Sequence, residues 1–309
     1  MLMIYVLLLV GIFLLYIGAD YLIKGAIYLG LKLKISPAFL GIFVIGCGTS
    51  FPELLVSLSS AANNHLAIAY GNIIGSNIFN VLIIMGLILS FSAVVVKKTT
   101  NTDIIFLLLS NILFLIFFFV TGINLFTGSI LLVCLAGSLL LSFKSNKDGY
   151  EEELTVNHIL PNILIIVWFI VLGFIALFSG SSLLIDSSIA IARNFGMSEK
   201  IIGLTIVALG TSLPELASSI VAIMKKESDI AVFNILGSNI FNVTAIPGII
   251  GIMKPYNLGS QFLLDGIFFA IALIILSGVL LKYKNIVIPK YLGILSLFLY
   301  GAYNFFMFT

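Results

Sequence analysis

Long apolar runs separated by short polar breaks extend along the whole chain. The runs fall at about 3–23, 37–61, 66–90, 102–120, 123–143, 159–189, 199–223, 230–252, 259–281 and 286–308. Each run is close to the ~20 apolar residues that a helix needs to cross the hydrocarbon core of a bilayer. The pattern therefore predicts an all-α integral membrane protein with ten transmembrane helices, here called spans 1 to 10.

Composition supports this prediction and excludes soluble classes of protein. Hydrophobic residues make up 61% of the 309 residues and charged residues only 9%, against about 25% charged residues in soluble domains. The net charge of +2 also excludes an electrostatic nucleic-acid binder, which needs a clustered basic face. The lipid bilayer is the partner that this composition indicates, and no obligate protein partner is evident.

The basic residues predict how the chain is oriented. With the N-terminus outside, twelve Lys and Arg residues fall on the inner side of the membrane, and only Arg193, Lys200 and Lys254 fall outside. Loops rich in Lys and Arg stay in the cytoplasm. We therefore expect a multi-pass protein of the cell membrane with both termini outside and the polar linker 144–158 inside.

An internal repeat divides the chain into two halves. A shift of 162 residues aligns NIIGSNIFNV (72–81) with NILGSNIFNV (234–243), and GTSFPEL (48–54) with GTSLPEL (210–216). The predicted halves are 1–143 and 159–309, with the repeated motifs at 41–89 and 203–251. Because five spans is an odd number, the second half enters the membrane in the opposite direction, as in secondary transporters that bind substrate near the midplane. A repeat that serves packing alone is the alternative, but packing requires no carboxylate.

The repeated motif places a carboxylate in the middle of two predicted spans. An ionised side chain at that depth costs about 2.5–3.5 kcal/mol, and no Lys or Arg lies near Glu53 or Glu215 in the same spans. A bound cation or a proton is the better explanation. A proline before each glutamate frees the carbonyl four residues back, at Gly48 and Gly210, and open backbone at membrane depth is tolerated where it lines a cavity.

The following span in each half adds oxygen ligands. Two triplets have spacing that puts each on one helix face: Asn72, Ser76 and Asn80, and Asn234, Ser238 and Asn242. Hydrogen bonding between helices is the alternative role, above all for Asn72 and Asn234. With Glu53, Glu215, Ser50 and Ser212, the centre offers only hard oxygen ligands, which favour calcium, sodium or both over zinc or copper.

These motifs resemble the alpha repeats of the calcium/cation antiporter superfamily, and those of sodium/calcium exchangers in particular. The resemblance implies a core of spans 2, 3, 7 and 8, against which spans 1 and 6 slide. It also implies a central ion site formed by Glu53, Glu215, Asn80 and Asn242. The implied flanking sodium sites use Ser50 with Ser76 and Ser212 with Ser238. Backbone carbonyls complete the coordination shells, and they belong to Gly46, Thr49, Ala208 and Thr211.

One position departs from that family pattern. Sodium/calcium exchangers can carry Asp where this chain has Asn242, so here only two ionisable groups face the site. Two carboxylates neutralise one calcium ion or two sodium ions. The short linker also lacks large regulatory domains, which is typical of prokaryotic transporters.

The sequence thus predicts a secondary antiporter that exchanges Ca²⁺ for Na⁺ by alternating access. A proton/calcium exchanger is the first alternative, because buried carboxylates that repel each other bind protons as well as cations. An ion channel is a weaker alternative. An intramembrane hydrolase is disfavoured, since the chain has neither an H-E-x-x-H motif nor a G-x-S-x-G motif. We therefore expect no enzyme activity and no cofactor, only transported ions.

Overall fold

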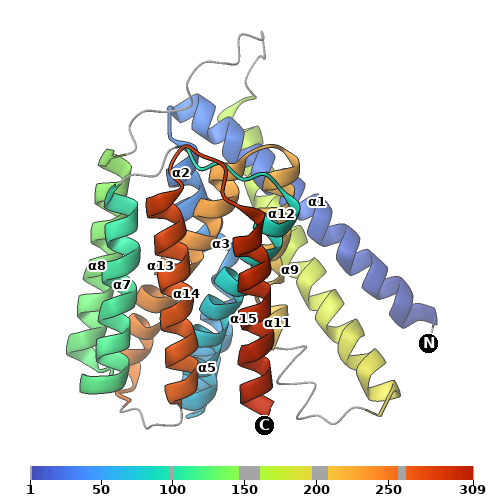
Figure 1. The fold of residues 1–309 in the computed structure, drawn as a ribbon. Helices are drawn as coiled ribbons and strands as arrows, with labels where there is room; N and C mark the ends of the chain where they lie inside the picture. The colour runs from blue at the N-terminus through green and yellow to red at the C-terminus, as the bar shows by residue number, and fades with distance from the viewer. Residues whose placement is uncertain (1, 98–100, 146–160, 197–207, 257–261, 309) are drawn as a thin grey trace.

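Helices form nearly all of the structure (Figure 1). The computed structural model describes residues 2–97, 101–145, 161–196, 208–256 and 262–308. Within these ranges the chain forms no β-strand, only isolated bridges such as the one between Val95 and Val287. The prediction of an all-α protein is confirmed.

The first half begins with one long helix and continues through several broken ones. Its elements are α1 (Leu2–Leu33), α2 (Pro37–Phe39), η1 (Leu40–Gly46), α3 (Cys47–Thr49), α4 (Phe51–Ala62), α5 (Leu66–Phe79), η2 (Asn80–Met85), α6 (Gly86–Phe91), α7 (Asn101–Ile116), η3 (Phe117–Thr121) and α8 (Leu125–Ser145). The η segments are wider, π-type turns, which often occur at functional sites.

The second half forms helices in a similar order among its described residues. Its elements are α9 (Ile163–Asn194), α11 (Ala208–Gly210), α12 (Leu213–Met224), α13 (Ser228–Met253), α14 (Leu263–Lys282) and α15 (Lys290–Phe308). Part of the predicted run 199–223 lies outside the described residues. Where the first half has η2, the second half keeps a regular helix through Asn242.

Seven of the described helices are long and apolar enough to cross a membrane. An eighth span is added if α2 to α4 count as one span that is bent by 42°. α12 is apolar but has only 12 residues. The chain is therefore a membrane protein with several apolar spans, and the full count of ten stays a prediction.

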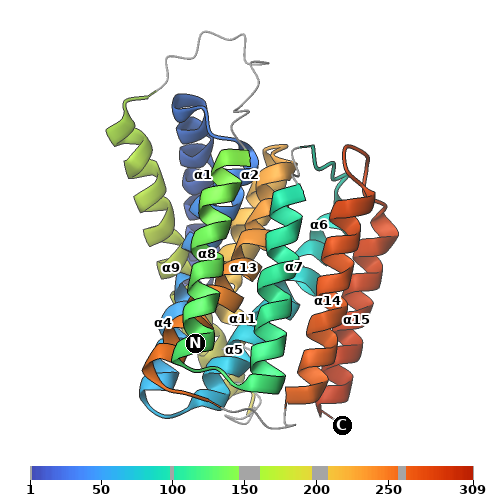
Figure 2. The ribbon, with the colours of Figure 1, turned by 90° about the vertical axis from the view of Figure 1, so that its left-hand side faces the viewer.

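The helices separate into a central bundle and an outlying pair. α1 and α9 lie side by side and lean away from the other helices (Figures 1 and 2). They expose large apolar side chains such as Phe13 and Trp168, which suits contact with lipid tails. α13 lies in the bundle and is largely buried, because its Gly, Ala, Asn and Ser residues let neighbouring helices approach closely.

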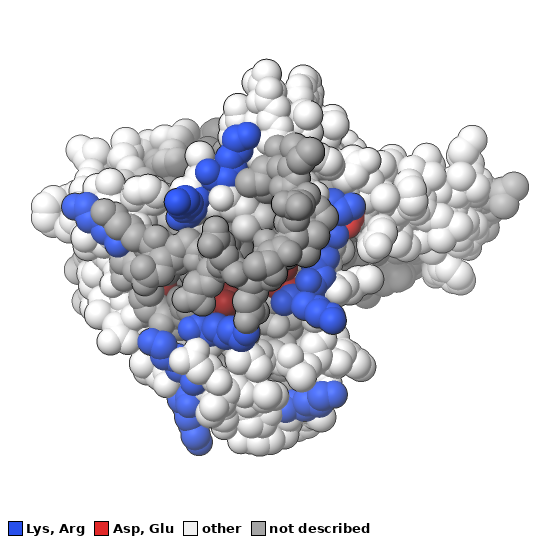
Figure 3. All heavy atoms as spheres, turned by 90° about the horizontal axis from the view of Figure 1, so that it is seen from above, with Lys and Arg blue, Asp and Glu red and all other residues white. Residues whose placement is uncertain are grey.

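Lysine side chains gather at one end of the molecule. Figure 3 looks at this end, where α1, α8 and α14 finish, and shows lysine side chains spread across it. Lys32, Lys144 and Lys282 lie in the last turns of those three helices. At the opposite end, Lys254 donates to the backbone oxygen of Ala62, 3.1 Å away. The lysine-rich end, with Lys32, Lys144 and Lys282, is the one that the distribution of basic residues predicts to face the cytoplasm.

Glycines form the contact between α1 and α9. A Cβ atom at Gly18 would lie 2.6 Å from the backbone nitrogen of Leu177, and one at Gly173 would lie 2.7 Å from that of Leu22. Farther along the same seam, Gly11 faces Gly180. The 162-residue shift relates Gly11 to Gly173 and Gly18 to Gly180. The two helices therefore cross through equivalent glycines, and their backbones meet because no side chain separates them.

We expect Gly173→Ala to destabilise this contact by about 1–3 kcal/mol, because the added methyl group meets backbone atoms of α1 that cannot move aside. The melting temperature of the purified protein measures the effect. Gly278→Ala is the matched control, since no atom lies within 4 Å of a Cβ atom at that position. Equal melting temperatures for the two variants would contradict the close contact between α1 and α9.

Candidate ion-binding site

The repeated proline and glutamate lie at the start of a new helix in each half. α3 ends at Thr49 and α4 begins at Phe51, and Ser50 between them has φ −80° and ψ 7°. In the second half Ser212 precedes α12 with nearly the same dihedral angles, φ −88° and ψ 9°. Pro52 and Pro214 therefore occupy first helical turns, where the missing N–H group needs no partner.

This placement lowers the cost of the buried carboxylates. Glu53 lies in the first turn of α4 and Glu215 in the first turn of α12. The unpaired N–H groups and the positive end of the helix dipole favour negative charge at this position. The sequence predicts a kinked span, and in the first half the structure shows two helical segments that meet at Ser50, with Glu53 at the beginning of the second one.

The two halves exchange hydrogen bonds through these serines and glutamates. The hydroxyl group of Ser50 donates to Glu215 Oε1 over 2.9 Å, and that of Ser212 donates to Glu53 Oε1 over 2.9 Å. All four residues are fully buried. Each carboxylate is therefore held by the opposite half, in an arrangement that has the symmetry of the repeat.

Several buried oxygen atoms at this centre have no hydrogen-bond partner among the described residues. They come from both halves: Glu53 Oε2, Glu215 Oε2, Asn80 Oδ1, Asn242 Oδ1 and Thr211 Oγ1. Buried polar atoms are almost always paired in proteins, so a cluster of unpaired oxygen atoms requires an explanation. All of these atoms belong to residues that the sequence predicts at the site, and all can coordinate a hard cation.

The amide nitrogens of the two site asparagines are held by neighbours, which leaves their oxygens free. Asn242 Nδ2 donates to Ser76 Oγ over 3.1 Å. Asn80 Nδ2 donates to Asn239 Oδ1 over 3.3 Å. Ser238 donates instead to the backbone oxygen of Gly46, 3.0 Å away. Ser76 thus contacts a site asparagine, and Ser238 and Gly46 contact each other between the two halves; their predicted roles as sodium ligands stay predictions.

The remaining predicted residues are less uniform. Thr49 is buried and donates to the backbone oxygen of Ile45 over 3.0 Å, with Asn234 Oδ1 3.4 Å away. Its counterpart Thr211 has a hydroxyl group without a partner among the described residues. Ala208 begins α11, and its side chain lies outside what the structure describes.

Asn72 and Asn234 connect helices within each half. Asn72 donates to the backbone oxygen of Glu53 and to Ser57 Oγ, over 3.2 and 3.0 Å. Asn234 donates to the backbone oxygen of Glu215 over 3.3 Å and to Ser218 Oγ over 3.0 Å. The interhelical role that the sequence leaves open for these two residues is the one that the structure shows.

The structure adds residues that the sequence does not reveal. Ser181 on α9 donates to the backbone oxygen of Gly210 over 2.8 Å, and so satisfies a carbonyl that Pro214 frees. At the equivalent glycine of the first half, Gly48, the side chain of Phe174 from α9 packs directly against the backbone. Neither residue could be found from the motif, because both come from a helix far from it in the sequence.

No basic or soft ligand belongs to the site in the described part of the chain. None of the hydrogen-bond donors to Glu53 or Glu215 is a Lys or Arg side chain. The described residues also contain no group of three or more His, Cys, Asp and Glu residues. Cys47 and Cys134 are free thiols, and His65 is exposed. Fold and site together therefore define a membrane protein with a buried polar centre whose described side chains present oxygen atoms.

Comparisons with known proteins identify the family. The model of the family "Sodium/calcium exchanger protein" matches residues 3–144 and 165–309. The chain is therefore a membrane antiporter that belongs to the sodium/calcium exchanger family. The resemblance seen in the sequence motifs is confirmed.

Similar proteins come from bacteria and archaea. The chain is 35% identical over 257 residues to the putative antiporter CaxA of Alkalimonas amylolytica, with 80% of each chain covered. It is 26% identical to the sodium/calcium exchanger MaX1 of Methanosarcina acetivorans, with 97% of each chain covered. The solved structure of the sodium-calcium exchanger NCX_Mj superposes with a TM-score of 0.84 and 29% identity, over 98% of each chain.

Proposed function

We propose that this antiporter exchanges Ca²⁺ for Na⁺ across the cell membrane by alternating access. The observation that supports this most directly is the set of unpaired buried oxygen atoms from both halves, which includes one oxygen of each of the two buried carboxylates. Similarity to proteins named sodium/calcium exchangers supports the choice of ions. Calcium takes about 6–8 oxygen ligands in flexible geometry, which suits a mixed set of carboxylate, amide and hydroxyl oxygens.

In this proposal the central ion lies between the two glutamates. Glu53 and Glu215 supply the charge, and Asn80 and Asn242 supply amide oxygens. The flanking sodium positions use Ser50 with Ser76 and Ser212 with Ser238, and the shells are completed by the carbonyls of Gly46, Thr49, Ala208 and Thr211. Two carboxylates neutralise one Ca²⁺ or two Na⁺, so the two kinds of ion compete for the same charge. This competition couples the fluxes.

Replacing either glutamate removes half of that charge. We expect Glu53→Gln and Glu215→Gln each to lower calcium transport by at least about 100-fold, because the remaining carboxylate cannot neutralise a divalent ion at membrane depth. Uptake of ⁴⁵Ca²⁺ into proteoliposomes measures this rate. Glu227→Gln, outside the site at the start of α13, is the matched control. Wild-type transport by either site variant would contradict the proposed site.

Proton coupling is the second candidate, and Asn242 is the residue that favours it. With Asn at this position in both repeats, the site has only two ionisable groups. A carboxylate oxygen without a partner, such as Glu53 Oε2, can accept a proton as well as a cation. In this case the same glutamates exchange Ca²⁺ for H⁺.

An uptake experiment separates the two couplings. Proteoliposomes are loaded with Na⁺ or with choline at matched pH, and ⁴⁵Ca²⁺ uptake is followed after dilution into sodium-free buffer. We expect rapid uptake only with internal Na⁺, because Na⁺ must leave the shared site as Ca²⁺ enters. If the rate of ⁴⁵Ca²⁺ uptake does not depend on internal Na⁺ but increases with an imposed pH gradient, this would contradict sodium coupling and establish proton coupling. Glu53→Gln serves as the transport-dead control.

The proposal includes ten spans in two inverted halves, residues 1–143 and 159–309, joined by the cytoplasmic linker 144–158. Matching geometry at equivalent positions supports it. Asn64 and Lys226, which the 162-residue shift aligns, both have positive φ angles, 64° and 65°. Inverted halves put these equivalent turns on opposite sides of the membrane, with both termini outside.

Cysteine labelling tests this topology. In a chain with Cys47→Ala and Cys134→Ala, we introduce Asn63→Cys or Lys226→Cys, both at exposed positions. In intact cells a membrane-impermeant maleimide should label only Asn63→Cys, because Lys226 lies on the basic side that stays in the cytoplasm. Labelling of both variants from outside would contradict the inverted arrangement. Labelling of Lys226→Cys alone would reverse the orientation.

A further inference from the structure

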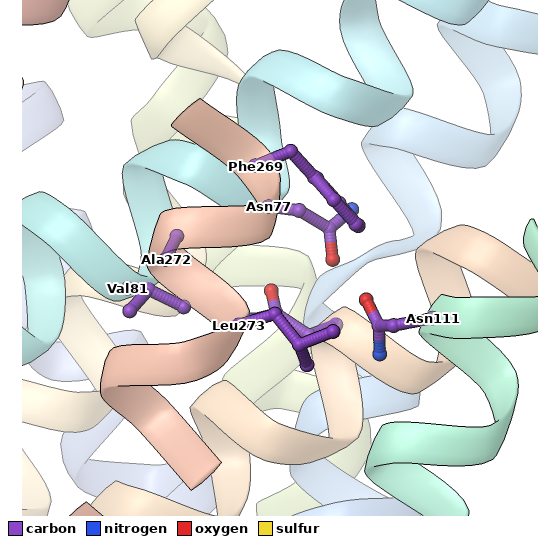
Figure 4. A pocket seen from close by; sticks show the side chains of 7 residues that line it. Asn77, Val81, Asn111, Phe269, Ala272 and Leu273 are labelled. Carbon is purple, nitrogen blue, oxygen red and sulfur yellow. The ribbon is translucent and has the colours of Figure 1, made fainter. Parts of the chain in front are cut away.

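A small cavity lies beside the candidate ion site, where helices from both halves meet (Figure 4). It is about the size of one water molecule. Its lining combines amide and apolar side chains: Asn77, Val81, Asn111, Asn239, Phe269, Ala272 and Leu273. Residues of the ion site are absent from this lining, so the cavity is a separate feature.

Two amide oxygens face this cavity because the nitrogens of the same groups are held elsewhere. Asn77 Nδ2 donates to the backbone oxygen of Ile73 over 2.7 Å, and Asn111 Nδ2 donates to that of Leu107 over 2.7 Å. Figure 4 shows the two side-chain oxygens pointing toward each other. Asn77 is buried, and its Oδ1 atom has no partner among the described residues. The cavity therefore has two oriented acceptors.

The third asparagine connects the cavity to the ion site. Asn239 Oδ1 accepts a hydrogen bond from Asn80 Nδ2 over 3.3 Å. Because Asn239 lines the cavity and its oxygen is already used, we infer that its amide nitrogen is available to a ligand there. One water molecule fits this set, because it donates two hydrogen bonds and accepts one, and buried waters typically make about three. A cation fits poorly, since the Asn239 amide presents a donor.

A difference between the two repeats leaves Asn77 Oδ1 in this cavity without a hydrogen-bond donor. The 162-residue shift aligns Asn77 with Asn239, Asn80 with Asn242, and Asn111 with Leu273. Asn80 Nδ2 donates to Asn239 Oδ1. If the repeat were exactly symmetric, Asn242 Nδ2 would donate to Asn77 Oδ1 in the same way. Asn242 donates instead to Ser76 Oγ, over 3.1 Å. Asn77 is left without this donor, and Asn111 faces it where the other half has an apolar Leu273.

We propose that this cavity binds one water molecule that fixes the orientation of Asn80 at the ion site. The water donates to Asn77 and Asn111 and accepts from Asn239. Asn239 is then held with its oxygen toward Asn80 Nδ2, which turns Asn80 Oδ1 toward the ion. Asn77, Asn111 and Asn239 are positioning residues in this scheme. Their expected effect on the affinity for Ca²⁺ rests on the proposed function, whereas the presence of the water molecule does not.

The water itself is tested by a crystal structure of the full chain at a resolution that shows ordered solvent. We expect a peak within hydrogen-bond distance of Asn77 Oδ1 and Asn111 Oδ1. An empty cavity would overturn the proposal. A peak with an anomalous signal after soaking in thallium would overturn it in favour of a monovalent cation. This readout does not depend on which ions the protein transports.

The positioning role is tested with Asn111→Leu, which copies the residue of the other half. We expect the water peak to vanish and the half-saturating Ca²⁺ concentration to rise about three- to tenfold, as for one lost hydrogen bond, while the maximal rate stays within twofold. Asn77→Leu is the second variant, with the same expectation. Asn304→Leu on α15 is the matched control, because Asn304 also donates to a carbonyl four residues back but is not one of the residues that line the cavity.

Two results would refute this role. One is an unchanged half-saturating concentration in both cavity variants after the water has gone. The other is an equal shift in Asn304→Leu, which would mean a general loss of packing. Melting temperatures of all three variants identify any that fail to fold. If no variant or wild-type protein transports calcium at all, the proposed function fails, and the crystallographic test of the water still stands.

Discussion

Two carboxylates held inside a membrane protein without a basic partner are the constraint on which this structure depends. Glu53 and Glu215 are fully buried, and a charge at this depth is costly. Each glutamate begins a helix, so unpaired N–H groups and the helix dipole stabilise its charge. Each also accepts a hydrogen bond from a serine of the opposite half. One oxygen of each carboxylate is thus satisfied by protein, and the other has no hydrogen-bond partner among the described residues.

Close approach of the two halves follows from this arrangement. A serine hydroxyl is short, so the break in one half must come near the glutamate of the other. Glycines make this possible. A Cβ atom at Gly46 would lie 2.7 Å from the backbone oxygen of Asn234, and one at Gly237 would collide with the backbone of Ile42. The same contact brings the Gly46 carbonyl within 3.0 Å of Ser238 Oγ. Small residues thus bring polar groups from both halves close together.

The sequence predicts most of the helical fold and most members of the candidate site, since both depend on local patterns. Apolar runs mark the spans, and the repeated motif marks Glu53, Glu215 and the residues around them. The contacts between halves are not predicted. Spacing places Ser50 on a helix, but the crossing of helices decides that it reaches Glu215 and not Glu53. Residue spacing also does not determine the orientation of a side-chain amide group. The hydrogen bond from Asn80 to Asn239 is therefore seen only in the three-dimensional structure.

The two halves resemble each other at the carboxylates and differ in what supports them. Ser181 satisfies the Gly210 carbonyl, whereas the equivalent position in the first half is Ala19. Asn80 and Asn242 likewise donate to different partners. In the proposed alternating-access mechanism, the two halves exchange conformations between the two access states. Contacts with exact repeat symmetry would then contribute equally to both states and could not favour either. On that proposal, the equilibrium between the states is set by contacts that only one half makes. The residues that make these contacts are ones that a repeated motif cannot reveal.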